Sequence, residues 1–332
     1  MARLGGLALI LCSVCALAQW REAKPSEASP TFKANISLVR VDAEVANGAR
    51  PVSGLKKEDF LVHDNGAAQT LVNFGREEVP LDLILLFDVS GSMRPVVEDV
   101  ASVAHEALAQ LKDGDRVGVA YFTKHATMAL NPSSNLDRVE DAIRNDILQQ
   151  PFEGGTNIHG GIEFCGEKLA RLDQQKGSGR RRAVLVITDN KGMYTNRETQ
   201  IIEGLWEADV VVSGLIVNSP EGGGMRYPAG GRGPARMPFP MPGPRIPGMT
   251  HGMNRVAEET GGDCLKANRI DQDFPLIMQR LRTRYSLYYA VPKGQPGEHR
   301  RVVVELAGAA KSDHPYAKVY ARKGYVIPAW EP

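Results

Sequence analysis

Residues 81–93 read LDLILLFDVSGSM, and this stretch decides the fold. An almost unbroken apolar run stops at Asp88, and a short polar turn with Ser90, Gly91 and Ser92 follows. Such a run is typical of a parallel strand that is covered on both faces. Ligands of open α/β sheets bind outside the carboxyl ends of the strands, so Asp88 stands where a binding site is expected.

The pattern of apolar strands and helical segments continues to about residue 284. A second buried-type strand, RRAVLVITDN over residues 181–190, ends at Asp189. Strands that alternate with amphipathic helices predict an α/β fold with a doubly wound, mostly parallel, Rossmann-like sheet over residues 80–284.

Residues 35–78 and 285–328 have a different pattern, in which apolar and polar residues alternate. The first of these segments carries two Asn-Gly turn signals, Asn47-Gly48 and Asn65-Gly66. Neither segment has enough strands to be stable alone. We therefore expect the N- and C-terminal strands to pair in one flanking β-sandwich, with residues 285–328 paired to residues 35–78.

The N-terminus has the features of an export signal. Residues 1–18 combine Arg3, an apolar core and an Ala-Leu-Ala cleavage site, and they predict a signal peptide followed by a polar leader at 19–34. A short membrane anchor is the alternative. No later segment is apolar enough to span a bilayer, so we expect a secreted, periplasmic or cell-envelope protein. Residues 219–249 are rich in Gly and Pro and predict a disordered insertion.

Composition and isolated residues exclude several classes of function. The 332 residues carry a formal net charge of +1, which gives no general basic field for nucleic acid. The histidines show no zinc spacing, and His159 is interpreted as a helix-surface residue. The run Arg180–Arg182 is interpreted as a solvated turn. Cys165 and Cys264 remain after signal cleavage, and the sequence leaves open whether they pair.

Three polar segments predict a metal site. Asp88, Ser90 and Ser92 have the i, i+2, i+4 spacing that lets side chains of a tight turn converge. Thr156 lies in FEGGTNIHGG at the start of a predicted helix, and Asp189 ends a strand. Carboxylate and hydroxyl oxygens suit Mg²⁺ or Mn²⁺ better than zinc. The alternative is that Asp88 only caps the helix beginning near Met93.

Together these segments resemble the metal-ion-dependent adhesion site (MIDAS) of von Willebrand factor type A domains. The resemblance covers Leu81 to about Tyr285. The whole chain resembles bacterial exported proteins related to this family, notably acidobacterial ones. They share a V-x-G-L-x-x-x-D-F-x-V-x-D-x-G segment, seen here from Val52 to Gly66, and an R-K-G-Y tail, here Arg322–Tyr325.

The resemblance implies a role for each matching residue. Ser90 and Ser92 would bind the metal directly, whereas Thr156, Asp88 and Asp189 would bind it directly or through water. The family more often has Gly after the second Asp, where this chain has Asn190. A carboxylate of a protein partner would take the open coordination position.

The expected function is therefore a non-enzymatic, metal-dependent protein-binding module whose partner presents an Asp or Glu. One alternative is a metal-dependent phosphoesterase of the same fold, although no general base is identifiable. Another is a structural envelope protein whose metal site only stabilises the fold.

Overall fold

The computed structural model describes residues 38–76, 79–172, 179–193, 195–218 and 252–327. The predicted signal peptide, the leader and the insertion at 219–249 lie outside the described residues. Within these ranges, no helix has the length and apolar character needed to cross a membrane.

A six-stranded central sheet forms the α/β part of the chain. Its strand order is β11-β10-β9-β6-β7-β8, and all neighbours are parallel except β7 and β8, which are antiparallel. The strands are β6 (Leu81–Asp88), β7 (Arg116–Phe122), β8 (Ala126–Ser133), β9 (Arg181–Thr188), β10 (Val210–Val217) and β11 (Cys264–Ala267). Strand β6 is buried along its whole length, as its unbroken apolar run predicts.

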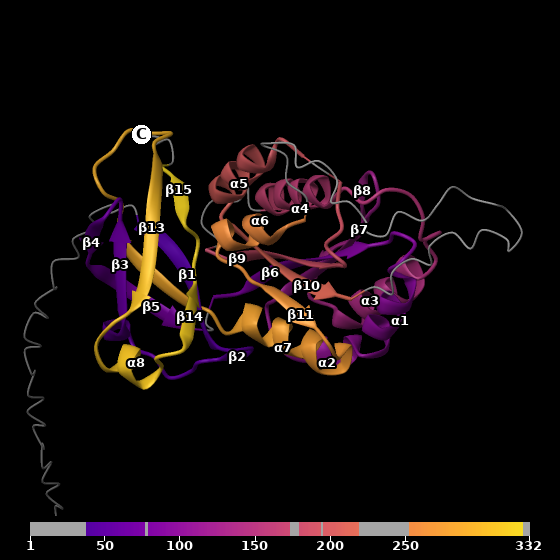
Figure 1. The fold of residues 1–332 in the computed structure, drawn as a ribbon, viewed down its shortest axis with the longest axis horizontal. Helices are drawn as coiled ribbons and strands as arrows, with labels where there is room; N and C mark the ends of the chain where they lie inside the picture. Colours follow the sequence, from indigo (N-terminus) through magenta and orange to yellow (C-terminus); the bar gives the residue numbers. More distant parts are fainter. Residues whose placement is uncertain (1–37, 77–78, 173–178, 194, 219–251, 328–332) are drawn as a thin grey trace, which may run out of the picture. The chain divides into compact units, whose positions relative to one another are not determined.

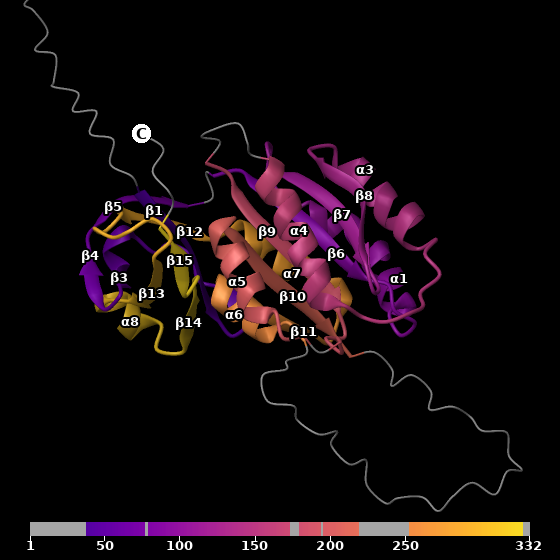
Figure 2. The same ribbon diagram turned by 90° about the horizontal axis from the view of Figure 1, so that it is seen from above.

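Helices cover both faces of this sheet, and each face has its own apolar core. Figure 1 shows α4, α5 and α6 on one face and α1, α2 and α7 on the other. Figure 2 shows the first group lying over the strands. The helices are α1 (Arg94–Ser102), α2 (Ala104–Leu108), α3 (Leu136–Asp141), the π-helix η2 (Ala142–Ile147), α4 (Ile158–Leu172), α5 (Glu198–Glu207), α6 (Asn254–Thr260) and α7 (Ile270–Arg282).

The helix predicted over residues 93–111 is interrupted at Val103. The Ser102 hydroxyl donates a 2.7 Å hydrogen bond to the Asp99 carbonyl. Such a bond offers the backbone an alternative to the helical pattern. Helical periodicity cannot reveal an interruption of one residue, because the apolar stripe continues across it.

Strands from both ends of the chain form a β-sandwich. One sheet has the order β14-β1-β12-β5 with β2 paired to β1, and the other has the order β15-β13-β3-β4. The elements are β1 (Leu38–Asn47), β2 (Arg50–Pro51), η1 (Lys57–Asp59), β3 (Phe60–Asp64), β4 (Ala67–Gln69), β5 (Leu71–Arg76), β12 (Tyr285–Ala290), β13 (His299–Leu306), α8 (Gly308–Asp313), β14 (Ala317–Tyr320) and β15 (Gly324–Val326). In Figure 1 the N-terminal indigo strands lie beside the C-terminal yellow ones.

Both sheets of the sandwich contribute to one apolar core, which includes Val41, Val62, Tyr289 and Val302. The predicted fold class, an α/β domain with a flanking sandwich, is therefore confirmed. Residues 308–313 (GAAKSD) contain Gly, Ser and Asp, which favour a turn, yet they form the short helix α8. The Ala-Ala-Lys segment favours a helix, and the Gly and Asp beside it conceal that preference.

Buried ion pairs join β1 to α7 and its C-terminal end. Glu44 of β1 accepts hydrogen bonds from Arg280 and, at 3.3 Å, from Arg284, and all three residues are buried. Burial lowers the pKa of Arg284, although Glu44 acts against this shift. The alternating pattern of β1 predicts that its polar face is solvated. The structure buries that face because arginines from distant parts of the chain bind to it.

The interpretation of Arg180–Arg182 as a solvated turn is wrong for a similar reason. Arg181 is buried and donates to the Arg282 carbonyl at 2.8 Å. Arg180 contacts Asp82 at 2.8 Å, and Arg182 donates to the Ala208 carbonyl at 2.7 Å. The three arginines therefore anchor the start of β9 to neighbouring segments.

We predict that Glu44→Gln destabilises the protein by about 3 kcal/mol, because it leaves buried guanidinium groups without a counter-charge. Chemical denaturation measures the free energy of unfolding. The matched control is Glu58→Gln, at an exposed acid of η1, which should change it by less than about 0.5 kcal/mol. Equal stability of the two variants would show that the buried cluster does not need the Glu44 charge.

Candidate metal site

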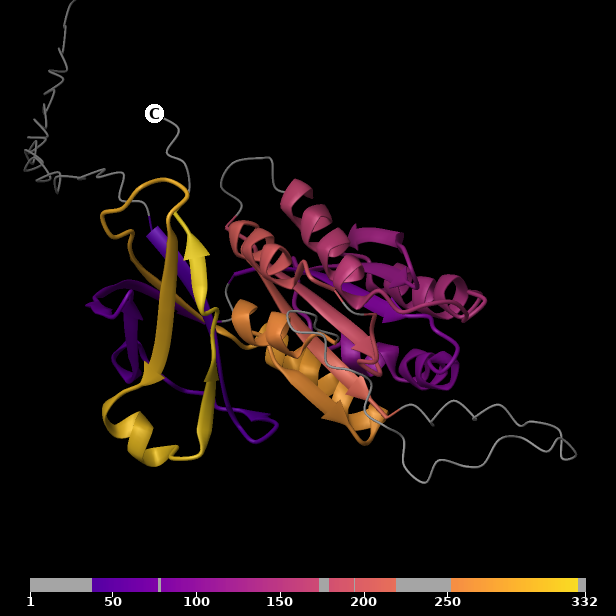
Figure 3. The same ribbon diagram turned by 45° about the horizontal axis from the view of Figure 1, so that its top comes forward.

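The carboxyl edge of the central sheet brings two acids together. Strands β6 and β9 are adjacent and parallel, and Phe87 is in register with Ile187. Asp88 ends β6 and Asp189 directly follows β9, so both reach the same edge. Figure 3 shows the arrowheads of the neighbouring strands β10 and β11 at this same end. The adjacency of β6 and β9 makes the site possible, and the alternation of strands and helices in the sequence does not by itself guarantee it.

Asp88 is fully buried and bonded through both carboxylate oxygens. Oδ1 accepts the Ser90 backbone N–H at 2.9 Å, and Oδ2 accepts the Thr188 hydroxyl at 2.7 Å. Burial raises the pKa of Asp88, hydrogen bonds from Thr188 and Ser90 oppose this shift, and the negative charge of Asp189 adds to it. The site therefore holds two like charges that a cation would stabilise.

Asp88 does not cap the helix that follows it. Helix α1 begins at Arg94, its N-cap residue is Met93, and this cap has no side-chain hydrogen bond. The Asp88 oxygens bond instead within the turn and to the neighbouring strand. The capping alternative is therefore wrong.

Asp189 connects two of the three predicted segments. Its Oδ2 accepts the Ser92 hydroxyl at 3.1 Å, and its Oδ1 accepts the backbone N–H of Lys191, also at 3.1 Å. The side chain of Asp189 is only 6% exposed. The loop after β6 and the loop after β9 thus share one carboxylate.

The Thr156 segment is bonded through its backbone to the loops after β9 and after β7. The Met193 N–H donates to the Thr156 carbonyl at 2.7 Å, which links the Thr156 loop to the loop after β9. The next residue, Asn157, donates its N–H to the Thr123 carbonyl at 2.8 Å. Direct hydrogen bonds therefore pair Asp88 with Ser90 and Ser92 with Asp189, whereas Thr156 is bonded through its main chain to the loop after β9.

The glycines around the site allow close approach of the loops. A Cβ atom on Gly91 would lie 3.3 Å from the Phe152 carbonyl oxygen. Gly160 follows Asn157, whose side-chain oxygen accepts the Gly160 N–H at 3.0 Å, and a Cβ there would meet the Asn157 amide at 2.4 Å. The absence of a side chain at Gly160 thus leaves room for the Asn157 amide at the start of α4. The absence of a side chain at Gly91 allows the tight turn after β6.

Thr188 and Asn190 contribute to the site although sequence reasoning assigned them no role. Thr188 bonds Asp88, as described above, and its hydroxyl also accepts the Asn190 N–H at 3.0 Å. Asn190 has a φ of 60°, a left-handed conformation that Asn tolerates better than most residues. Its side chain accepts the Met253 N–H at 2.8 Å and donates to Asn254 at 2.9 Å. Asn190 therefore stands where the family more often has Gly, and it ties the loop after β9 to α6.

His159 is buried, so its interpretation as a helix-surface residue is wrong. Its Nε2 lies 3.3 Å from Glu198 Oε1, and Arg255 donates to the other oxygen of Glu198 at 2.8 Å. Glu198 is also buried. These contacts connect the helices α4, α5 and α6, which gives His159 a structural role.

The two cysteines whose pairing the sequence left open are not bonded to each other. Cys165 of α4 is buried and Cys264 of β11 is partly buried, and each is a free cysteine. Burial raises the pKa of Cys264 to about 12, so this thiol is a poor nucleophile at neutral pH.

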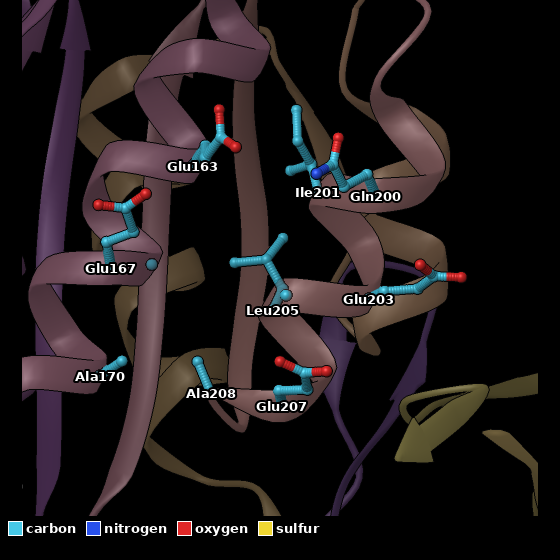
Figure 4. Close-up of a pocket in the computed structure, with 11 residues that line it drawn as sticks. Glu163, Glu167, Ala170, Gln200, Ile201, Glu203, Leu205, Glu207 and Ala208 are labelled. Carbon is cyan, nitrogen blue, oxygen red and sulfur yellow. The ribbon is translucent and has the colours of Figure 1, made fainter. Parts of the chain in front are cut away.

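A groove of about 450 Å³ lies between α4 and α5, and none of the five predicted metal residues lines it. Figure 4 shows Glu163 and Glu167 on one side and Glu203 and Glu207 on the other. Glu163 pairs with Arg197 at 2.6 Å. These acids are interpreted as solvated helix faces with surface ion pairs.

Within the described residues, no group of three or more His, Cys, Asp or Glu side chains could hold a metal ion. A metal at the β6–β9 edge would therefore depend on hydroxyl ligands in addition to two carboxylates. The donor set is all oxygen, which fits a hard divalent cation.

Comparisons with known proteins agree with this architecture. The family model for the von Willebrand factor type A domain matches residues 83–192. No curated protein matches the chain.

Several solved structures are similar at low identity. An aerotolerance-related membrane protein from Bacteroides fragilis is 19% identical, with a TM-score of 0.45, over 60% of this chain and 98% of that chain. A von Willebrand factor type A protein from Catenulispora acidiphila is 12% identical, with a TM-score of 0.43, over 90% of this chain and 76% of that chain.

Proximal thread matrix protein 1 from the mussel byssus, with a zinc-occupied MIDAS motif, is 19% identical, with a TM-score of 0.35, over 43% of this chain and 40% of that chain. The match to the family model of the von Willebrand factor type A domain covers residues 83–192, which include all five residues predicted to hold a metal.

Proposed function

We propose that this chain is an exported, non-enzymatic binding module that captures an acidic residue of a protein partner through a divalent cation. The cation, Mg²⁺ or Mn²⁺, would be held by the residues predicted from the sequence: Asp88, Ser90, Ser92, Thr156 and Asp189. The predicted signal peptide over residues 1–18 supports export to the periplasm or the cell surface.

One observation carries this proposal: Asp88 and Asp189 stand at the same strand-end edge, close enough to interact electrostatically, and the predicted ligands around them are oxygens. Burial of Asp88 disfavours its charged form, and the nearby charge of Asp189 disfavours it further. A divalent cation would offset both penalties. The residues present therefore fit a hard metal ion both in donor chemistry and in charge.

The bound ion would supply an electrophilic position for a carboxylate oxygen of the partner. The protein's own groups would hold and orient the ligands around it. Ser90 and Thr188 fix the two oxygens of Asp88, and Ser92 fixes one oxygen of Asp189. Such second contacts position ligands before the metal arrives and strengthen metal binding.

The phosphoesterase alternative has less support from the geometry. A nucleophilic carboxylate needs an oxygen that can reach the substrate, but Asp88 is fully buried and both of its oxygens accept hydrogen bonds. Turnover of a generic phosphoester such as p-nitrophenyl phosphate with Mg²⁺, lost in Asp88→Asn, would nevertheless favour the enzyme over the binding module.

The partner chemistry can be tested by selection from a random peptide library on the full chain. In Mg²⁺ we expect enrichment of peptides that contain Asp or Glu, with release by a chelator. The Asp88→Asn variant should enrich none of them. Peptides that lack acids, or that stay bound in chelator, would contradict capture through a metal-bound carboxylate. Metal binding without any peptide enrichment would favour the structural alternative.

We predict that Asp88→Asn lowers Mg²⁺ and Mn²⁺ affinity by at least about 100-fold, more than the loss of an outer contact usually causes. Calorimetry measures this affinity. Asn retains one oxygen for the Ser90 N–H, so the fold should survive, and removal of a buried charge should keep or raise the metal-free melting temperature. Asp313→Asn, at an exposed acid of α8, is the charge-matched control. Equal metal affinity in Asp88→Asn and the control would exclude the site.

We also predict that metal affinity falls with pH earlier than for an ordinary carboxylate site. Protons and the cation compete for ionised Asp88, whose pKa is raised above its usual 3.8 by burial and by Asp189. Calorimetry at falling pH should show that Mg²⁺ affinity begins to decline at a higher pH than at a site of unshifted carboxylates. A decline that begins no earlier than at such a site would contradict a raised pKa at a metal ligand.

The same raised pKa of Asp88 means that lower pH, which weakens metal binding, stabilises the metal-free protein. Because the folded state holds the proton more tightly than the unfolded state, ionised Asp88 destabilises the fold at neutral pH. Its contribution to the free energy of unfolding improves as pH falls through the raised pKa. The Asp88→Asn variant, measured in chelator, should lack this component of the pH dependence.

A further inference from the structure

Lys191 contacts the predicted metal ligand Asp189 at both of its oxygens. Its backbone N–H donates to Oδ1 at 3.1 Å, and its ammonium Nζ lies 3.8 Å from Oδ2. The side chain of Lys191 is 62% exposed, whereas that of Asp189 is 6% exposed. The backbone bond anchors Lys191 beside the acid, and its exposed side chain remains able to change position.

The ammonium and the predicted metal ligands converge on one oxygen. Asp189 Oδ2, which lies near Nζ of Lys191, also accepts the hydroxyl of Ser92 at 3.1 Å. A divalent ion held by Ser92 and Asp189 would therefore lie close to Asp189 Oδ2, the same oxygen whose negative charge the Lys191 ammonium already offsets. Two cations beside one carboxylate oxygen repel each other, and the solvent exposure of the ammonium keeps this repulsion modest.

We propose that Lys191 is a tethered cation that competes with the divalent ion for Asp189 and, once displaced, binds a second acid of the partner. This inference rests on the proposed function of the site and specifies its regulation and its preferred ligand. The ligand would be an acidic segment with two neighbouring carboxylates. One would coordinate the ion and the other would contact the displaced ammonium.

The surface beside Thr156 supports an acidic ligand of this kind. A Cβ atom on Gly155 would lie 3.4 Å from Lys124 Cγ and 3.4 Å from Met193 Sδ, so both side chains flank this glycine. Lys124 is exposed, and Met193 is 51% exposed. The Met193 N–H bonds the Thr156 carbonyl, which places this loop at the metal site. A second lysine and an apolar side chain thus extend the surface on which a peptide would rest.

The first test measures metal alone. Calorimetry with MgCl₂ and with MnCl₂ compares the parent chain with Lys191→Gln, Lys191→Arg and the control Lys311→Gln, at an exposed lysine of α8. Removal of the competing charge should raise metal affinity about three- to tenfold in Lys191→Gln, a modest effect because the ion pair is solvent-exposed. Lys191→Arg and Lys311→Gln should resemble the parent.

The outcomes separate this inference from the function on which it rests. A parent chain with no measurable metal affinity would overturn both. A parent that binds metal, with unchanged affinity in Lys191→Gln, would overturn only the competition. Lys191 is exposed, so each variant should fold, and Lys191→Arg keeps the charge as a second check on any nonspecific loss.

The second test measures ligand choice at saturating Mg²⁺. Glutarate, with two carboxylates, and acetate, with one, serve as probes in NMR titrations of the parent and of Lys191→Gln. The preference for glutarate should fall about threefold or more in Lys191→Gln, while acetate affinity changes less. A merely structural role would weaken metal and dicarboxylate together, whereas this inference requires opposite changes. An unaltered glutarate preference would overturn the contact with a second acid.

Discussion

The burial of Asp88 at the end of β6, with Asp189 nearby, is the constraint on which the rest of the site depends. Parallel pairing of β6 with β9 ends both strands at one edge, and it places a buried carboxylate near a second one. The surrounding groups offset the cost of these buried charges. Ser90 and Thr188 bond the first acid, and Ser92 and Lys191 contact the second. A divalent ion, as proposed, would complete this compensation.

The central strands and the residues of the candidate site could be predicted from the sequence, because the patterns that indicate them are local. The apolar run before Asp88 marks a covered strand, and hydroxyls at fixed spacing after it mark a turn that can bind metal. The strands β6 and β9 have the type and the ends that their residues indicate. The sandwich followed from a different kind of argument, since two incomplete sets of strands need each other.

The failures at Glu44, at Arg180–Arg182 and at His159 have a common physical cause: they concern polar groups whose partners are far away in the sequence. Glu44 is 236 residues from Arg280, to which it bonds. A charged residue in an alternating strand looks solvated until such a partner is known. His159 looked like a helix-surface residue for the same reason, and its partner Glu198 is on another helix. Hydrophobic periodicity indicates which residues are buried, but it does not indicate which buried charges form ion pairs.

The charge of the site explains why metal would precede the partner. Two carboxylates and the Lys191 ammonium leave one net negative charge, which repels an incoming acid. A divalent ion at the proposed site would change this to one net positive charge and would displace the ammonium toward the surface. A single binding event would thus reverse the sign of the local field and add a second anion contact. A neutral ligand would gain little from either change, so the proposed selectivity for acids would follow from electrostatics at the strand ends.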